Sequence, residues 1–461
     1  MASNFIFLLR KIRKVEGSTV FIASYFWAIL LGGLLLWLPF SNPGMKVSFL
    51  DAVFTATSAL CVTGLAVVDT GTSFSLIGQI ILLVLIQSGG LGITTFSVWL
   101  FLSLGRGIGF KSRLFFQSTF STRPTDELRG LLRLIFLFTF LVEAGGTLIL
   151  TFYWWQFFPI PLAFYQAVFH SVSAFCNAGF SLFPDNLIQY QGSYVVNGTI
   201  CGLIIFGGIG FPVAYEILEI TKKWYRGARI KVSLHTRLVL MTTAILIFGG
   251  ALVIYAIEYD EALKGFPLIT GLWIAFFQSV TARTAGFNTI DLAALTNPSL
   301  LVLIILMFIG ASPGSCGGGI KTSTFALLGG LLINRLKGKS QVHLFHRTVP
   351  EEIVSRSMAL IVLAGGLVLV MTTLVLMVES GHAPFEKAGG KLMEVLFEVV
   401  SAFGTVGLSI GITPKLESIS KILIIITMYL GRVGILSLGY SIAKREERHP
   451  ISYAEESVMV G

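Results

Sequence analysis

The sequence predicts an all-α polytopic membrane protein in which four helix–pore-loop–helix modules place eight transmembrane helices around a pseudo-fourfold central pore. Three observations predict this class. The 461 residues are 54% hydrophobic and only 12% charged, about half the charge of a soluble protein. A short glycine-bearing segment occurs four times along the chain, and lysine and arginine gather in a few of its connections.

The repeated segment has about ten helix-compatible residues that end at a short turn containing glycine. Its first copy runs from Phe54 to Asp69, FTATSALCVTGLAVVD, which is too short to span a bilayer. In each copy a phenylalanine precedes the turn glycine by ten residues, and successive glycines lie 115, 107 and 121 residues apart: Gly64, Gly179, Gly286 and Gly407. Four copies with constant internal spacing indicate a duplicated module rather than four unrelated glycine loops.

The chemistry of this segment suits a cation. A short helix that enters a membrane and returns as extended backbone presents carbonyl oxygens and the negative end of a helix dipole. Glycine fits such a turn because the backbone itself lines the ligand path and needs dihedral angles closed to other residues. The four segments are therefore predicted to form a filter for a partly dehydrated cation.

Apolar runs on either side of each pore segment define the modules. The predicted pore segments are 51–68, 164–184, 272–290 and 392–412. The predicted domains are a cytoplasmic N-terminus at 1–17, pore modules at 18–104, 131–222, 236–333 and 356–443, and a cytoplasmic C-terminal tail at 444–461. The first apolar run, 18–40, lacks a small-residue cleavage site and is predicted to be a retained helix.

Charge placement gives the orientation. The segments 1–17, 105–133, 221–237, 334–356 and 444–461 hold 24 of the 33 lysine and arginine residues. Because positive charge is enriched in cytoplasmic loops, both termini are predicted to be cytoplasmic and the four pore segments to enter from the outside. The basic excess is thus interpreted as a topology signal rather than as affinity for nucleic acid.

Glycines also interrupt the second helix of each module, and in module three the break expands to the loop 310–322, GASPGSCGGGIKT. Irregular backbone at membrane depth is tolerated only inside protein or beside a water-filled cavity. The loop is therefore predicted to face the central pathway just inward of the filter and to gate it. A phosphate loop is disfavoured because Ile320 separates Gly319 from Lys321 and no buried strand precedes the loop. A flexible hinge without a gating role is the alternative.

Two basic side chains are predicted to lie within the membrane near this loop: Lys321 at its end and Arg432 in the glycine break of module four. Charges at this depth usually line a cavity or pair. Arg432 either maintains a barrier below the filter or only binds carbonyl groups at helix ends. Arg283, Glu398 and His170, inside pore segments, are interpreted as groups that brace the filter rather than as ion ligands.

Other functional classes are less consistent with the residues. The four cysteines lack CxxC spacing, and the scattered histidines indicate no metal site. A secondary transporter of a small solute also uses discontinuous helices, but such folds are built on two inverted halves rather than four modules in one direction. A membrane enzyme would need a nucleophile–base pair or an acidic cluster at membrane depth, and none is evident in the sequence.

The four modules, the single glycine per filter segment and the SPGSCGGGIKT break resemble the superfamily of K+ transporters that includes bacterial TrkH and KtrB and plant HKT proteins. The resemblance covers essentially the whole chain, and the short N-terminus is more similar to the KtrB branch. In some plant relatives a serine replaces the first filter glycine and accompanies Na+ transport. The presence of Gly64 therefore favours K+, although the filter segments depart from the TVGYG of K+ channels.

The resemblance implies site residues as well. The implied potassium ligands are the residues at and just before the filter glycines: Val62, Thr63, Gly64, Asn177, Ala178, Gly179, Thr284, Ala285, Gly286, Thr405, Val406 and Gly407. The implied gate comprises Gly310, Ala311, Ser312, Pro313, Gly314, Ser315, Gly317, Gly318, Gly319, Lys321 and Thr322, with Arg432 opposite the loop.

The resemblance also implies a homodimer in the cell membrane with one pore per subunit. A cytoplasmic ring of regulatory subunits with RCK domains is expected to bind ATP or ADP and to control the pore. The chain itself is expected to be no enzyme, to hold no cofactor, to transport K+ and to contact membrane lipids but no nucleic acid. Whether Na+ activates transport or is co-transported is left open.

Overall fold

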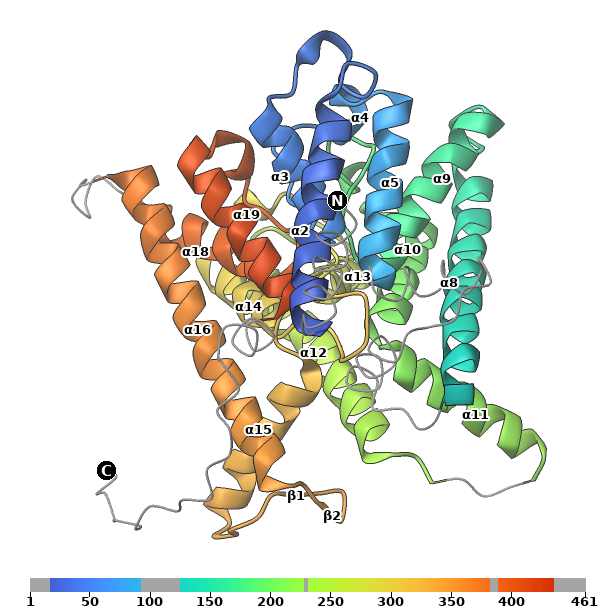
Figure 1. The fold of residues 1–461 in the computed structure, drawn as a ribbon, viewed down its shortest axis with the longest axis vertical. Helices are drawn as coiled ribbons and strands as arrows, with labels where there is room; N and C mark the ends of the chain where they lie inside the picture. The colour runs from blue at the N-terminus through green and yellow to red at the C-terminus, as the bar shows by residue number, and fades with distance from the viewer. Residues whose placement is uncertain (1–16, 93–124, 228–230, 382–388, 435–461) are drawn as a thin grey trace, which may run out of the picture.

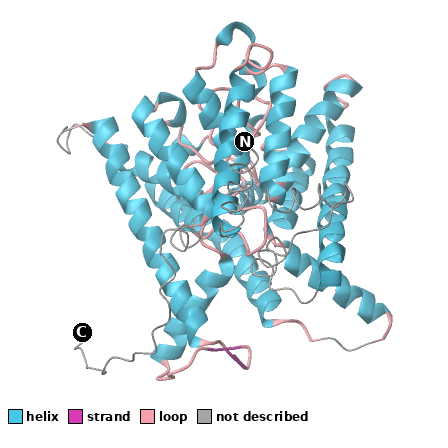
Figure 2. Cartoon of the chain, viewed as in Figure 1, coloured by secondary structure: helices cyan, strands magenta, loops and turns pink. Residues whose placement is uncertain are grey.

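The computed structural model describes residues 17–92, 125–227, 231–381 and 389–434, and most of this part of the chain is helical (Figures 1 and 2). Figure 2 shows loop segments running through the middle of the helical bundle. Both terminal segments lie outside the described residues, as do the ends of the first and fourth predicted modules, at 93–104 and 435–443.

The described helices follow one another in four similar groups, each with an incoming helix, a short helix, an extended segment and an outgoing helix. The first group has α2 (Gly17–Trp37), α3 (Phe49–Leu60), α4 (Thr70–Ser73) and α5 (Leu76–Leu91), with η1 at Pro43–Met45. The second has α8 (Thr125–Trp154), α9 (Ile160–Phe175), α10 (Tyr194–Gly208) and α11 (Phe211–Tyr225), with η2 at Ile188–Tyr190.

The third group has α12 (Leu234–Glu258), α13 (Leu268–Thr281), α14 (Asn297–Phe308) and α15 (Thr322–Leu336), with η3 at Leu292–Ala294. A small hairpin of β1 (His343–Leu344) and β2 (Arg347–Thr348) follows. The fourth has α16 (Glu351–Ser380), α18 (Lys391–Gly404) and α19 (Ser418–Val433), with η4 at Thr413–Lys415. Figure 1 shows the hairpin, α15 and α11 projecting from one end of the bundle.

Serine caps fix where several of these helices begin. The side chains of Ser48, Ser75, Ser193 and Ser233 each accept a hydrogen bond from the backbone amide three residues later. Such a cap satisfies a donor that the first helical turn leaves free. Carboxylates at the ends of two incoming helices do the same for outgoing helices, since Glu258 accepts from the amide of Thr296 and Glu379 from that of Glu417.

The four short helices are arranged in a ring. Each packs against the incoming helix of its own group and also against the outgoing helix of the preceding group: α9 against α5, α13 against α10, α18 against α14, and α3 against α19. The last contact returns from the fourth group to the first. Because the sequence of contacts closes on itself, the four short helices surround a common centre.

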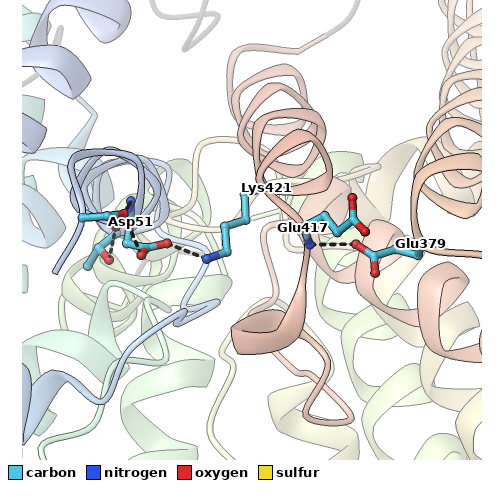
Figure 3. Close-up of polar contacts among 6 residues, drawn as sticks. Asp51, Glu379, Glu417 and Lys421 are labelled. Carbon is cyan, nitrogen blue, oxygen red and sulfur yellow. Dashed lines mark hydrogen bonds and ion pairs between the residues drawn. The ribbon is translucent and has the colours of Figure 1, made fainter. Parts of the chain in front are cut away.

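A salt bridge lies at the contact that closes the ring (Figure 3). Lys421 on α19 reaches Asp51 in the first turn of α3, with 2.7 Å between Nζ and Oδ1. Figure 3 also shows the Glu379 carboxylate meeting the backbone amide of Glu417 at the start of α19. Helices at opposite ends of the chain are therefore joined by a direct ionic contact.

The molecular surface is that of a helical membrane protein. Large apolar side chains face outward, among them Phe140 at 69%, Phe248 at 61% and Val362 at 74% exposure. By length and hydropathy, three described helices could cross a membrane: α8 from Arg133, α12 and α16. The α10–α11 pair, bent by 96°, would be a fourth span if it is counted as one. The other apolar helices are shorter in the described residues.

Candidate functional site

The four predicted filter glycines meet at the centre of the ring. A Cβ atom added to any of them would fall against the carbonyl oxygen just before the next glycine: Gly64 against Ala178, Gly179 against Ala285, Gly286 against Val406, and Gly407 against Thr63. The added atom would lie 2.7 Å from that oxygen at Gly179 and 2.5 Å at Gly286. We call the extended segments that end at these glycines, 62–64, 177–179, 284–286 and 405–407, the filter strands. The filter strands therefore border one another in chain order, and the fourth borders the first.

Backbone dihedral angles repeat in all four strands. The glycines have φ of +94°, +69°, +77° and +92° in chain order, and the residues two positions earlier also have positive φ: Val62, Asn177, Thr284 and Thr405. The intervening residues do not have positive φ. A β-strand with uniform dihedrals turns successive carbonyl groups to opposite sides, whereas alternation in the sign of φ turns them to the same side. Glycine tolerates this conformation, which other residues adopt at a cost.

The amide groups of the strands are turned back toward the short helices. The residue before each glycine donates its N–H to a helix carbonyl at 2.7–2.9 Å: Thr63 to Ser58, Ala178 to Ser173, Ala285 to Thr281, and Val406 to Ser401. Two of the glycine amides also donate to hydroxyl oxygens at 3.0 Å, Gly64 to Ser58 and Gly407 to Ser401. These anchors were not predicted, although a hydroxyl residue five or six positions before each glycine is a usable signal.

The carbonyl oxygen just before each glycine is left without a protein donor. In the described residues, no hydrogen bond is donated to the carbonyl oxygen of Thr63, Ala178, Ala285 or Val406. The helices α3, α9, α13 and α18 end three to five residues before the glycines, so their negative dipole ends approach the same centre. A closed ring of free carbonyl oxygens is an arrangement that can replace part of a cation's hydration shell.

The loop between α14 and α15 lies against the inner residues of two strands. The amide of Gly318 donates to Oγ1 of Thr405 at 3.0 Å. A Cβ atom added to Gly317 would collide with Oγ1 of Thr284. Since Thr284 and Thr405 each precede their strand's glycine by two residues, the loop covers one end of the ring.

Hydrogen bonds connect the loop to the second group of helices. Ser312 and Cys316 donate their amides to the carbonyls of Gly208 and Gly207 at 3.1 and 3.2 Å, and Phe211 donates to Gly314 at 2.9 Å. Other loop residues contact one another: Gly310 with Gly318 and Gly319, Ala311 with Thr322, and Ser312 with Ser315 and Thr322. Two more contact residues outside the loop, Pro313 with Gly210 and Gly319 with Gly404. All predicted gate residues in the loop therefore lie in one cluster.

Arg432 connects this loop to two other groups. Its guanidinium donates one hydrogen bond to the carbonyl oxygen of Cys316 in the loop and another to that of Gly89 near the end of α5. Lys321 instead bonds within the loop, with Nζ 2.7 Å from the Gly317 carbonyl oxygen. Arg432 on α19, rather than Lys321, is thus the basic side chain that joins the loop to α5 in the first group of helices.

The three predicted bracing residues are all buried. Arg283, immediately before a filter strand, donates to the carbonyl oxygen of Thr243 on α12 at 3.3 Å. His170 on α9 lies 3.0 Å from the hydroxyl of Ser181, two residues after Gly179. Glu398 on α18 accepts hydrogen bonds from Ser409 and Thr413, after Gly407. His170 and Glu398 therefore each contact the segment that follows a filter glycine, whereas Arg283 contacts the incoming helix α12.

Comparisons with known proteins agree with this geometry. A sequence model of the TrkH family, described as cation transport protein, matches residues 14–449. The chain is 38% identical to the Ktr system potassium uptake protein B of Bacillus subtilis over 96% of both chains. It is also 38% identical to the Ktr system potassium uptake protein B of Vibrio alginolyticus, over 96% of this chain and 94% of that protein. These relatives are named as transport proteins rather than enzymes.

A further relative is the potassium/sodium uptake protein NtpJ of Enterococcus hirae, 35% identical over 98% of this chain and 99% of its own. Among solved structures, the potassium transporter TrkH from Vibrio parahaemolyticus superimposes with a TM-score of 0.70 over 93% of this chain and 85% of that chain. At 19% sequence identity this likeness concerns the fold alone.

Proposed function

Because the chain belongs to the TrkH family of cation transport proteins, we propose that it is the ion-conducting subunit of a potassium-uptake system in the cell membrane. The observation that carries the proposal is the closed ring in which each glycine strand borders the carbonyl of the next. Relatives named as potassium uptake proteins match nearly the full chain. In this proposal four pore modules, at the predicted boundaries, contribute eight membrane-crossing helices.

Permeation follows from the ring. A K+ ion leaves part of its hydration shell and is coordinated by carbonyl oxygens at and before the four glycines. The oxygens just before the glycines, on Thr63, Ala178, Ala285 and Val406, accept no protein hydrogen bond among the described residues. They therefore need not lose a hydrogen bond to bind the ion. An inside-negative potential contributes about 2.3 kcal/mol per charge per 100 mV to entry. The chain therefore needs no ATP hydrolysis of its own.

The loop 310–322 is the proposed gate, because its glycines contact the inner strand residues Thr284 and Thr405. In the closed state Arg432 fixes the loop to α5 through the carbonyl oxygens of Cys316 and Gly89. A partner that prefers the displaced loop raises the fraction of open molecules above the basal level of the chain alone. By analogy with the family, that partner is a cytoplasmic ring of RCK-domain subunits that binds ATP or ADP, beneath a homodimer of this chain whose termini are cytoplasmic.

Flux of Rb+ tests the proposal. The full chain is reconstituted into liposomes loaded with K+, and radioactive Rb+ uptake is measured against competing K+, Na+ or choline. Strong competition by K+, weaker competition by Na+ and none by choline is the expected result. Absence of Rb+ uptake above empty liposomes would refute an ion-conducting role and would favour the secondary transporter of a small solute.

A further inference from the structure

The helix α11 leaves the bundle at a right angle to the helix before it. α10 ends at Gly208 and α11 begins at Phe211, and the two helices are bent by 96°. Gly210, at the bend, has φ of +97°, a conformation that favours glycine. Figure 1 shows α11 directed outward past the lower end of α8. Because α10 packs against α8, a candidate membrane span, a helix at a right angle to α10 runs along the membrane rather than through it.

Hydrogen bonds to the next helix place α11 at a membrane surface. The Glu216 carboxylate accepts from the amide of Ser233 at 2.6 Å and from the hydroxyls of Ser233 and Thr236. Ser233 caps the first turn of α12. Since α12 is long and apolar enough to cross a membrane, its first turn lies near one membrane surface. The middle of α11 is held at that level.

One face of α11 is apolar along the whole helix. Val213, Ile217, Ile220 and Trp224 follow one another at spacings of four, three and four residues, so they share one side of the helix. Val213 is buried against the bundle, whereas Ile217 is 38% and Trp224 70% exposed among the described residues. Tyr225, next to Trp224, is 79% exposed. The described part of the chain therefore leaves the outer half of this face uncovered.

The opposite face is polar and ends in positive charge. Lys222, Lys223 and Arg226 are exposed there. Glu219 lies 4.0 Å from Lys222 and 3.6 Å from Lys223, so one acid faces three basic residues. From Ile220 to Arg237 the sequence has six lysine and arginine residues and no acidic one. This surface is complementary to the phosphate groups of anionic lipids.

We propose that α11 is a membrane-surface helix that binds anionic phospholipids. Trp224 and Tyr225 lie among the headgroups, where aromatic side chains with one polar end are favoured. Ile217 and Ile220 enter the upper part of the acyl chains, and the basic residues bind lipid phosphates. A membrane is favoured over a protein partner as the occupant of this face, because a helix at the level of the membrane surface has lipid beside it.

The test uses the full chain in vesicles of equal parts phosphatidylcholine and phosphatidylglycerol, with bromine on the upper acyl carbons of one lipid or of the other. Bromine quenches tryptophan fluorescence at close range. Because the chain has seven tryptophans, the Trp224 signal is the difference between the parent and Trp224→Phe. We expect both brominated lipids to quench it. The ratio of the two quenching constants is expected to show about fivefold enrichment of phosphatidylglycerol, the effect of one basic residue near an anionic surface.

Two variants separate charge from position. The charge variant replaces three basic residues of α11 together: Lys222→Gln, Lys223→Gln and Arg226→Gln. It is expected to remain quenched but to lower the enrichment to about one. The control variant removes the same charge from exposed positions at and just after the end of α15: Arg335→Gln, Lys337→Gln and Lys339→Gln. It is expected to keep the parental enrichment at α11. In 1 M salt, where the screening length is about 3 Å, the parental enrichment is expected to disappear.

The buried Trp154 provides the unquenched reference, read as the difference between the parent and Trp154→Phe. Thermal unfolding in detergent checks that each variant folds. A Trp224 signal as insensitive to bromine as that of Trp154 would overturn the inference and would show that protein covers this face. Equal quenching by the two lipids in the parent, or parental enrichment in the charge variant, would refute binding of anionic lipid. Since no transport is measured, these outcomes are independent of the proposed function.

Discussion

Lys421 and Asp51 form an ionic contact of 2.7 Å between residues separated by 370 positions in the chain. Lys421 belongs to the last described helix, α19, and Asp51 to the first short helix, α3. Their side chains are only 15% and 19% exposed, so the pair is screened less than a surface salt bridge. The contact lies at the one place where the ring of helices closes between the two ends of the chain.

Replacing Lys421 with Gln is expected to destabilise the protein by about 1 kcal/mol, because Asp51 would keep its partly buried charge without a partner. Thermal unfolding of the purified protein measures this effect. Asp51→Asn alone is also expected to destabilise, and the double variant to lose less than the sum of the two. Strict additivity would show that the two side chains are not energetically coupled.

The matched control for this pair is Lys223 with Glu219 on α11. These side chains are 55% and 35% exposed, and their charged atoms lie 3.6 Å apart. Lys223→Gln is expected to change stability by no more than about 0.5 kcal/mol. A loss as large as that of Lys421→Gln would indicate a general effect of removing a lysine rather than an effect of the ring contact.

Substituting Ser for Gly286 is expected to lower the flux of K+ relative to Na+ by about tenfold or more. Gly286 has φ of +77°, and an added Cβ atom would lie 2.5 Å from the carbonyl oxygen of Val406. The left-handed backbone alone costs a residue with a side chain about 1–2 kcal/mol, and the contact would displace a ring carbonyl. Gly64→Ser is expected to act in the same way. Competition of K+ and Na+ with Rb+ uptake in liposomes measures the ratio.

Gly365→Ser on α16 is the control for these variants, since a Cβ atom there would meet nothing within 4 Å. Its flux ratio is expected to equal that of the parent. If Gly286→Ser also retained the parental ratio while folding normally, the ring of glycines would not be the selective element.

Removing the charge of Arg432 by substitution with Gln is expected to raise Rb+ flux in the absence of a cytoplasmic partner. Arg432 bonds the carbonyls of both Cys316 and Gly89, and charge-assisted hydrogen bonds contribute roughly 1.5–3 kcal/mol each. Loss of one such bond would shift the equilibrium between the closed and the displaced loop about tenfold toward the displaced loop. Uptake by liposomes that contain only this chain measures the change.

Arg335→Gln is the control for Arg432, because Arg335 is exposed in the last turn of α15. Its partner-free flux is expected to stay at the parental rate. Unchanged flux in Arg432→Gln would support the alternative that this arginine only binds carbonyl groups at helix ends.

The positions of the ring glycines could be predicted from sequence because one local requirement, a positive φ at a fixed distance from a helix end, was repeated four times. A glycine break in the second helix of module two was also predicted. Its 96° bend was not, since it depends on contacts such as that of Gly210, where an added Cβ atom would lie 2.6 Å from the carbonyl oxygen of Pro313. Tertiary partners of this kind leave no local pattern in the sequence.

The contact of Lys421 with Asp51 and the capping of Thr296 by Glu258 were also missed. Each joins residues far apart in the chain, and the sequence around each of them is that of an ordinary loop or helix end. The role of Arg432 was left open between two alternatives, because the sequence located the charge but gave neither of its carbonyl partners.

The glycines near the end of the outgoing helices yield the last prediction. Gly207 on α10 is expected to be intolerant of Ala, because an added Cβ atom would collide with the carbonyl oxygen of Phe175 at the end of α9. Overpacking of this kind typically costs about 1–3 kcal/mol. Gly202, five residues earlier on the same helix, has nothing within 4 Å of an added Cβ atom, so Gly202→Ala is expected to be neutral or to stabilise by up to about 1 kcal/mol. Unfolding temperatures of the two variants should therefore shift in opposite directions or differ by several degrees. Equal shifts would show that α10 can move away from α9 without cost, which the bonds from Ser312 and Cys316 to Gly208 and Gly207 argue against.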